Sequence, residues 1–499
     1  MKIANVPAGE ILMDRFVVTM NGEKVPVSAA RVSAVIYNTE WPGHQRPLDQ
    51  TEIAGFVRLE SEEPVEVCVT VEEEIKEVCV RPLSKKIEAV QNGKEIRFTL
   101  PGVGQYVLEV NDFHRALHIF VAPKVEKPEL GPDDLYFGPG EHEVGVVILH
   151  DNQTVYLDAD AVVYGGFLAA GAKNITITGT GILDGSREER LPGHWGILNG
   201  GKDDNFFADM SKKEIAAFVR ENKMIPGSIR FYKCENCRVE HITCRDASNW
   251  AIAAGGCDNL VFDDVKEIGM WRYNSDGIDL YNSSNCIIRN CFLRNFDDCV
   301  VIKGLKGWGH RNLENIITEN CVIWCDWGRE LEIGAETNAI EYQNIIFRNC
   351  DLIHGSWLRL DIQHHNDAHI HDILFEDIRC EYTKHQQKLK FQKDMTKPYE
   401  EEEEFLFEQP GLLGAFFVNL GLFGAPACGK KVERIYFKDI QVLSDEEVPM
   451  PTCRFVGLDE KNCIDGVVIE NLTRNGVKLT DQKAANLEWN EYSYHIELK

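Results

Sequence analysis

The heptads "NCIIRNC" (Asn285–Cys291), "NIITENC" (Asn315–Cys321) and "NIIFRNC" (Asn344–Cys350) are three versions of one pattern. In each, apolar residues alternate with polar ones, which is typical of a short strand with one buried face. Asparagine at both ends suits turns, because it tolerates left-handed backbone angles. The copies start 30 and 29 residues apart, a period that indicates a repeat architecture.

Related segments extend the repeat through most of the chain, with starts mostly about 23 to 32 residues apart, a period typical of repeat proteins. They begin at Asn174, Asn236, Asn259, Asp372, Arg434 and Gly466. A helical solenoid would place apolar residues three and four positions apart, which these segments do not do. We therefore predict an all-β fold, a right-handed parallel β-helix whose coils stack about 4.8 Å apart. Stacking would place Cys291, Cys321 and Cys350 in one interior ladder.

The first part of the chain lacks this repeat. Short alternating strands broken by Gly, Pro and charged residues predict a small antiparallel β-sandwich over residues 1–125. Residues 126–134 read as a linker, and residues 135–499 as the β-helix and catalytic domain. Two insertions interrupt the coils, one at 186–225 with a helical pattern in its middle, the other at 381–430 with a run of glutamates.

Composition narrows the possible partners. The chain has 499 residues, 44% of them hydrophobic, and a net charge of −27. Such a charge repels nucleic acid and anionic lipid, so we expect neither a nucleic-acid nor a membrane partner. We find no signal peptide or membrane span and read the 16 cysteines as reduced thiols, which together predict a cytoplasmic protein. "CENC" (Cys234–Cys237) has no partner motif for a zinc site and is interpreted as a structural thiol pair.

Two acidic groups lie about one coil apart. Asp276 belongs to "NSDGID" (Asn274–Asp279), and Asp297 and Asp298 begin "DDC" 21 residues after Asp276. In stacked coils these carboxylates would converge, and like charges raise one another's pKa. One group could then stay protonated while another is ionised, as glycoside hydrolysis requires. The alternative is that these residues only form turns, as expected for Asp279.

This pair of motifs, "NSDGID" followed by "DDCVVIK", resembles the polygalacturonase family of glycoside hydrolases, including its dextranase and isopullulanase relatives. "NITITGTGILDGS" (Asn174–Ser186) and residues 226–252 resemble earlier coils of that family. The resemblance implies a right-handed parallel β-helix and hydrolysis with inversion. It assigns the general acid to Asp297 and the water-activating carboxylates to Asp276 and Asp298. Lys303 matches a frequent substrate-binding position.

The sequence departs from that family on the next two coils. Arg329 stands where the family has a histidine, and Glu330 follows it. Arg359 is retained, but Asp361 stands where a lysine binds a uronate carboxylate. An anion pocket that loses a lysine and gains an aspartate should disfavour galacturonate. We therefore expect these four residues to form a different substrate site, with a neutral glycan such as an α-glucan as one possibility.

Several aromatic and histidine residues surround these motifs. Trp271, Tyr273 and Trp327 are predicted to line sugar subsites, as are their neighbours Trp308, Trp324 and Trp357, although packing is the competing interpretation for each. His364, His365, His369 and His371 suggest a metal site, but we interpret them as exposed turn residues and predict neither a metal nor a cofactor.

The sequence therefore predicts an inverting glycoside hydrolase whose partner is a carbohydrate substrate. A cytoplasmic location favours an exo-acting role on short imported chains. Two other functions stay open. A β-helix polysaccharide lyase or epimerase would need a basic catalytic residue and often Ca²⁺, and a non-catalytic carbohydrate-binding β-helix would explain the missing histidine.

Overall fold

The computed structural model describes residues 1–34, 48–188, 227–385, 411–418 and 430–499, together with positions 211, 213, 214 and 217 and two short strands. These strands, β35 (Leu389–Lys390) and β36 (Phe405–Phe407), pair with each other. Of the expected helix in the first insertion, only positions 211, 213, 214 and 217 are described, and the last three are helical. Most of the second insertion lies outside the described residues. Within the described part, no helix is long and apolar enough to span a membrane.

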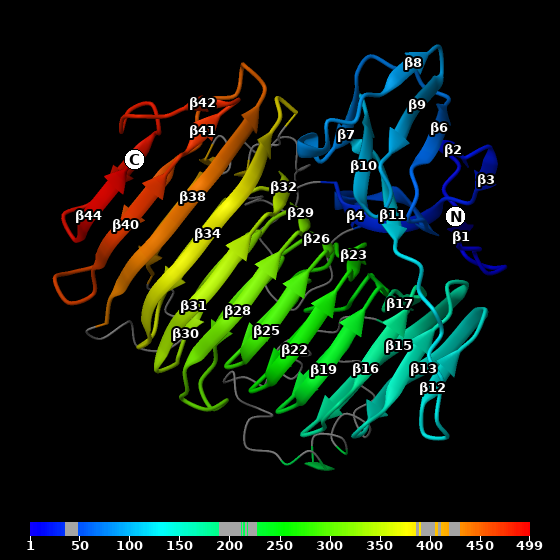
Figure 1. Ribbon diagram of the computed structural model, residues 1–499, viewed down its shortest axis with the longest axis horizontal. Coiled ribbons are helices and arrows are strands. Elements are labelled where there is room, and N and C mark those ends of the chain that lie inside the picture. Colours follow the sequence, from blue (N-terminus) through cyan, green and yellow to red (C-terminus); the bar gives the residue numbers. More distant parts are fainter. Residues whose placement is uncertain are drawn as a thin grey trace.

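The N-terminal part folds into two facing sheets, seen at the upper right of Figure 1. One sheet has the order β1 (Lys2–Ile3), β5 (Thr51–Glu60), β11 (Asp112–Ala122), β10 (Gly104–Val110), β7 (Val78–Arg81), with β4 (Ser28–Ser33) on β5. The other has the order β3 (Glu23–Val25), β2 (Phe16–Met20), β6 (Val65–Val71), β9 (Glu95–Leu100), β8 (Val90–Asn92). All pairs are antiparallel except β5 and β11, which run parallel. Two 3₁₀ turns, η1 (Leu48–Gln50) and η2 (Leu83–Lys85), complete this sandwich.

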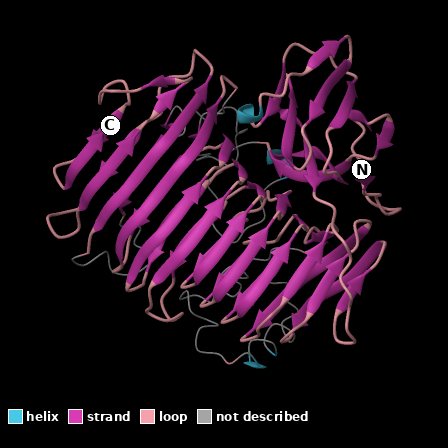
Figure 2. Cartoon of the chain, in the orientation of Figure 1, coloured by secondary structure: helices cyan, strands magenta, loops and turns pink. Residues whose placement is uncertain are grey.

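The rest of the described chain winds through three parallel sheets, and Figure 2 shows that it is built almost wholly of strands. The repeat sheet carries the heptads identified in the sequence. Its strands are β12 (Leu135–Phe137), β14 (Thr154–Leu157), β16 (Thr176–Gly179), β19 (Glu235–Glu240), β22 (Asp258–Asp263), β25 (Ser284–Arg289), β28 (Leu313–Glu319), β31 (Glu341–Arg348), β34 (His369–Tyr382), β38 (Val432–Ser444), β40 (Ile464–Glu470) and β44 (Ser493–Leu498). The short hairpin of β41 (Thr473–Arg474) and β42 (Val477–Lys478) follows β40.

Two further sheets complete each coil. The aspartate sheet, which carries Asp279 and Asp361, contains β13 (Gly140–Leu149), β15 (Ala161–Ala170), β18 (Ile229–Tyr232), β21 (Ile252–Gly255), β24 (Ile278–Tyr281), β27 (Val300–Gly304), β30 (Leu331–Thr337), β33 (Leu358–His364), β37 (Gly411–Phe417), β39 (Cys453–Val456) and β43 (Leu487–Trp489). The sandwich-facing sheet contains β17 (Ile182–Asp184), β20 (Thr243–Arg245), β23 (Lys266–Ile268), β26 (Phe292–Asn295), β29 (Val322–Cys325) and β32 (Asp351–His354). The predicted β-helix preceded by a small β-sandwich is confirmed.

Asparagines link consecutive coils at the turns, and cysteines form the interior ladder that the heptads predict. Asn315 has a φ of 57°, and its equivalents Asn285 and Asn344 have φ values of 58° and 52°. The Asn315 side chain donates to Asn285 Oδ1 at 2.9 Å, and Asn344 donates to Asn315 Oδ1 at 2.7 Å. Inside, Cys291, Cys321 and Cys350 are fully buried in the aliphatic core. The 15 cysteines in the described residues, Cys234 and Cys237 among them, are free thiols.

The N-terminal sandwich packs on the sandwich-facing sheet of the β-helix through an apolar cluster. Phe56 and Phe120 of the sandwich meet Phe292 and Trp324 of the β-helix, and all four side chains are buried. Polar contacts surround this cluster, including a hydrogen bond of 2.7 Å from Gln105 Nε2 to Asp264 Oδ1. Trp324 therefore belongs to the interface between sandwich and β-helix, in agreement with the packing interpretation.

Candidate active site

The acidic motifs occupy the turns that lead into β24 and β27 of the aspartate sheet. Asp276 O accepts a hydrogen bond from Ala251 N, and Asp298 O accepts one from Gly277 N, both at 2.8 Å. Asp276 and Asp298 therefore hold equivalent positions on consecutive coils. Arg329 holds the next equivalent position, since its carbonyl accepts from Cys299 N at 2.8 Å.

Gly328 allows the next coil to approach the aspartate pair closely. A Cβ atom at this position would lie 2.5 Å from both the backbone nitrogen and Oδ1 of Asp298. Asp298 Oδ1 instead accepts a hydrogen bond of 2.9 Å from Arg329 N. The turn therefore fixes the Asp298 carboxylate through the backbone of the following coil.

Burial and mutual repulsion change the proton affinity of these carboxyls. The exposed fractions of Asp276, Asp297 and Asp298 are only 2%, 7% and 8%. Desolvation, followed by the charges of Asp276 and Asp298, raises the pKa of Asp297 well above its usual value. Desolvation also raises the pKa of Asp276 to about 6, although the Lys303 ammonium opposes this shift. The arrangement thus favours a protonated Asp297 beside Asp276, which ionises more readily.

Lys303 links two of the aspartates on neighbouring strands. Its Nζ lies 3.0 Å from Asp276 Oδ2 and 2.9 Å from Asp279 Oδ1, and it also lies 4.2 Å from the ring centre of Trp250. These carboxylates raise the pKa of Lys303 well above its usual value despite burial. Asp279 is fully buried on β24, in agreement with the structural role expected for it.

Arg329 and Asp361 form a second charged group on the following coils. Arg329 Nε lies 3.3 Å from Asp361 Oδ2 and 4.0 Å from Glu332 Oε1, and the guanidinium stacks over Trp357 at 4.8 Å. Glu332 and Asp361 are in register on β30 and β33. Desolvation, with Asp298 next, raises the pKa of Glu332 well above its usual value. Sequence reasoning missed Glu332, although the alternation of β30 indicates that it faces outward between Leu331 and Ile333.

Glu330 and Arg359 do not join this group. Both side chains are fully buried and form an ion pair with each other, and Arg359 Nη2 donates to the backbone oxygen of Glu381 at 2.7 Å. The Arg359 guanidinium lies 4.6 Å from the Tyr382 ring. The expectation that they bind substrate is therefore corrected: they contact each other at a buried corner between two sheets.

The aromatic residues are divided between packing and the surroundings of the site. Trp271 donates through Nε1 to Asp246 at 2.9 Å, and Tyr273 is fully buried against Phe296, so these two pack the turn before Asp276. The ring of Trp327 lies edge-on to the ring of the half-buried Trp357, and the Arg329 guanidinium stacks over Trp357. A further apolar cluster on the aspartate sheet contains Tyr232, Trp250, Tyr281 and Trp308. Of these, the sequence predicts a subsite role only for Trp308.

The four histidines are not exposed turn residues as a group. His364, His365 and His371 are buried, and only His369 is half-buried, so that prediction is wrong. His364 Nδ1 lies 2.7 Å from Thr337 Oγ1, and His365 Nδ1 lies 2.9 Å from Val418 O. They hold the turn between β33 and β34.

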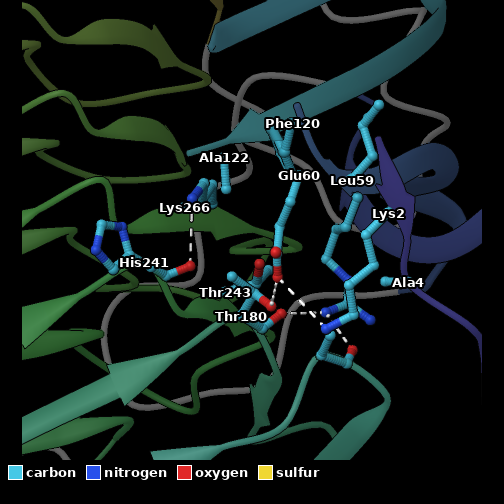
Figure 3. A pocket seen from close by; sticks show the side chains of 12 residues that line it. Lys2, Ala4, Leu59, Glu60, Phe120, Ala122, Thr180, His241, Thr243 and Lys266 are labelled. Atoms are coloured by element: carbon cyan, nitrogen blue, oxygen red, sulfur yellow. Dashed lines mark hydrogen bonds and ion pairs between the residues drawn. The ribbon is translucent and has the colours of Figure 1, made fainter. Parts of the chain in front are cut away.

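Two pockets lie between the sandwich and the β-helix, away from the aspartates. Figure 3 shows the smaller one, where Glu60, Thr180 and Lys266 converge around a volume of about 20 Å³. That volume holds about one water molecule and no sugar. The second, about 330 Å³, is lined by residues such as Arg81, Asn111 and Tyr382.

Comparison with known proteins shows that the central coils are similar to one family. Residues 167–387 match the model described as Glycosyl hydrolases family 28. An exopolygalacturonase of Cochliobolus carbonum is 24% identical over 201 residues, which are 38% of this chain and 37% of that protein. A probable polygalacturonase of Arabidopsis thaliana is 30% identical over 111 residues, 22% of this chain and 23% of that one. The matched part thus spans well under half the length of these curated relatives.

The overall architecture also has a counterpart among solved structures. Dex49A from Penicillium minioluteum superimposes with a TM-score of 0.55 at 11% sequence identity, covering 99% of this chain and 96% of that one. This likeness concerns the fold, and it includes the N-terminal sandwich because it spans nearly the whole chain. The central coils that carry Asp276, Asp297 and Asp298 match the model of glycosyl hydrolases family 28, which confirms the predicted resemblance.

Proposed function

We propose that the protein hydrolyses a glycosidic bond with inversion, with Asp297 as general acid and Asp276 and Asp298 as the carboxylates that activate water. The observation that carries this proposal is the contrast between Asp297, whose pKa is raised by burial and by Asp276 and Asp298, and Asp276, whose pKa is about 6. Near neutral pH the first can give a proton to the leaving oxygen while the second accepts one from water.

The positions of the three aspartates support this division of roles. Asp276 and Asp298 are equivalent on consecutive coils, so their carboxylates form a pair. Asp297 precedes Asp298 in the same turn. Lys303 stabilises the ionised form of Asp276, and the Arg329 backbone holds Asp298 Oδ1. Each water-activating carboxylate therefore has its own positioning partner.

The charge of the site supports a substrate that is neutral at the cleaved sugar. Six carboxyl groups face or flank the site, against the two cations Lys303 and Arg329. They are Asp276, Asp279, Asp297, Asp298, Glu332 and Asp361. Lys303 is already paired with Asp276 and Asp279, and Arg329 with Asp361. Among the described residues, a uronate carboxylate would find no unpaired cation at this site and would be surrounded by acidic groups.

A lyase or epimerase mechanism has less support. It requires a basic residue that loses its proton near neutral pH. Burial would lower the pKa of Lys303, but the adjacent carboxylates raise it well above the usual value, which keeps the ammonium charged. Arg329 is likewise held in its charged form by Glu332, Asp298 and Asp361.

The test uses the variant Asp297→Asn and a matched control on the same β-helix. Purified protein is incubated with neutral α-glucan oligosaccharides and with pectic oligosaccharides, and the anomer of the first product is read by NMR. We expect inversion by the wild type and a loss of about 10² to 10⁴ in turnover for Asp297→Asn. Asp377→Asn changes a half-exposed aspartate of β34, whose side chain is 50% exposed, and should leave turnover unchanged. Retention of configuration, or normal turnover by Asp297→Asn, would refute the proposal.

A further inference from the structure

A cluster of imidazole and carboxylate groups lies on the outer face of the repeat sheet, apart from the aspartates. His369 and His371 begin β34 and are two residues apart, so both side chains point to the same face. Glu341 of β31 is in register with His369, and Glu433 of β38 is in register with His371. Three consecutive coils therefore present these four side chains together.

The ligand atoms of three of these residues are close enough to share one ion. Glu341, His369 and His371 each offer one ligand atom, and these three atoms lie within 4.8 Å of one another. His371 Nε2 is 3.2 Å from Glu341 Oε2, and the two imidazole rings are 4.3 Å apart between centroids. Ligands bound at 2.0 to 2.2 Å around a tetrahedral zinc ion would be roughly 3.3 to 3.6 Å apart, so small side-chain movements suffice.

Hydrogen bonds from neighbouring side chains hold these ligands in orientations that are typical of metal sites. His371 Nδ1 lies 2.7 Å from Asp372 Oδ2, which directs Nε2 toward Glu341. Glu341 Oε1 accepts a hydrogen bond of 2.6 Å from Asn312 Nδ2, which leaves Oε2 facing the histidines. A carboxylate on the far nitrogen of a ligating histidine is the usual outer support of such a site. Asp372 fulfils this role while also accepting from Arg434 Nε at 2.9 Å.

The local charge favours a divalent cation. Glu341, Asp372 and Glu433 supply three negative charges, and Arg434 is the cation that contacts two of them, Asp372 and Glu433. Together these three carboxylates and the Arg434 guanidinium carry two net negative charges, which one divalent ion would balance.

We propose that Glu341, His369 and His371 form a binding site for a first-row transition-metal cation of the Zn²⁺ type, with Glu433 next to it as a further carboxylate. Ions of this type readily bind two nitrogens and one oxygen, whereas Mg²⁺ and Ca²⁺ prefer oxygen ligands. The site lies on the repeat sheet, so its role is to tie the coils of β31 and β34 together, and it does not depend on the proposed hydrolysis. The competing interpretation is a protonated His371 that donates to both Asp372 and Glu341 without any metal.

Co²⁺ and Zn²⁺ binding to the full-length protein distinguish these two interpretations. After treatment with a chelator and its removal, Co²⁺ is added and its visible absorption recorded, and Zn²⁺ binding is measured by calorimetry. We expect one Co²⁺ per chain with the strong visible bands of a tetrahedral site, displaced by Zn²⁺, and a higher melting temperature with Zn²⁺. His369→Gln, His371→Gln and Glu341→Gln should each weaken Zn²⁺ binding at least tenfold.

The control is His495→Gln on the same sheet. His495 Nδ1 lies 2.7 Å from Asp465 Oδ1, an exposed histidine–carboxylate pair without a second histidine beside it. This variant should bind Co²⁺ like the wild type. Circular dichroism verifies that each variant is folded, and Glu341→Gln serves as the mildest change. No Co²⁺ binding by the wild type, or equal Zn²⁺ affinity in the wild type and all three site variants, overturns the proposal.

Discussion

Arg329 Nε lies 3.3 Å from Asp361 Oδ2, and this ion pair occupies the coils on which polygalacturonase-like sequences carry other residues. The pair is largely buried, with side-chain exposures of 19% for Arg329 and 0% for Asp361. It neutralises the guanidinium that would otherwise attract an anionic sugar. The relationship between these two residues therefore connects the departure from the family pattern with the proposed neutral substrate.

Asp361→Asn tests this connection. Removal of one partner leaves a buried guanidinium without its closest counter-ion, and we expect a loss of roughly 3 kcal/mol in the free energy of unfolding, measured with urea. The freed Arg329 should also raise the affinity for uronic-acid oligosaccharides at least tenfold relative to neutral ones. Glu72→Gln is the matched control, because Glu72 and Lys94 pair at 3.1 Å on the exposed surface and contribute about 1 kcal/mol or less. If the ratio of the two affinities is unchanged, the Arg329–Asp361 ion pair does not determine which class of sugar binds.

The pH dependence of turnover follows from Asp276 and Asp297. Asp276 must be ionised to activate water, so the rate should rise as pH increases through about 6. Asp297 must keep its proton, so the rate should fall once the pH exceeds its raised pKa, which gives a bell-shaped profile. Lys303→Met removes the cation that lowers the pKa of Asp276 and should move the acidic limb upward by about one pH unit or more.

Lys306→Met, an exposed lysine two residues after β27, is the control for this profile and should leave both limbs in place. The limbs are read from kcat/KM between pH 4 and pH 9. If the acidic limb of Lys303→Met coincides with that of the wild type, Asp276 is not the group that must ionise.

The sequence predicts features that depend on the period of the coils, and it fails where distant segments pack. The heptads correctly predict the left-handed turn at Asn315 and the buried cysteines, because each coil repeats the same local geometry. The same period predicts that Asp276 and Asp298 converge. Glu330 and Arg359 illustrate the limit: they lie next to Arg329 and Asp361 in the chain, yet pair at a buried corner whose shape depends on Glu381 and Tyr382.

Trp324 and His371 show the same limit in other surroundings. Trp324 contacts His118 and Phe113 of the sandwich, about 200 residues away in sequence, so no local pattern indicates its burial. His371 appears to be a turn residue in the sequence only because the strand β34 begins earlier than its apolar run. In both cases the burial of the side chain depends on the structural element around it, which the local sequence pattern does not reveal.

Glu267 should make stability depend on pH. It is fully buried, and desolvation raises its pKa to about 8, against an ordinary value of 4.5. The folded protein therefore binds a proton that the unfolded chain loses, so this contribution to stability is complete below pH 4.5 and is lost as pH rises through 8. Glu330 and Glu381, with pKa values of about 7, act in the same direction. We expect the free energy of unfolding to fall as pH rises from about 4.5 to about 8.

Glu267→Gln should remove part of that fall. The amide oxygen can still accept from Asn295 Nδ2, which donates to Glu267 Oε2 at 2.8 Å in the wild type. The variant should match the wild type at pH 5 and exceed it by a few kcal/mol at pH 8, as measured by urea unfolding. Glu488→Gln, which alters an exposed glutamate, provides the control. Parallel pH curves for Glu267→Gln and the wild type would contradict this prediction.

Asn315 contributes both a backbone conformation and two hydrogen bonds to the repeat sheet. Its φ is 57°, a left-handed angle that most side chains avoid, and its side chain bonds to Asn285 and Asn344 on the neighbouring coils. Asn315→Gly retains the angle and loses the bonds, at a cost of about 1 to 2 kcal/mol. Asn315→Ala loses both and should cost about 1 kcal/mol more. Urea unfolding of the two variants separates these contributions, and equal stabilities would show that the angle imposes no preference there.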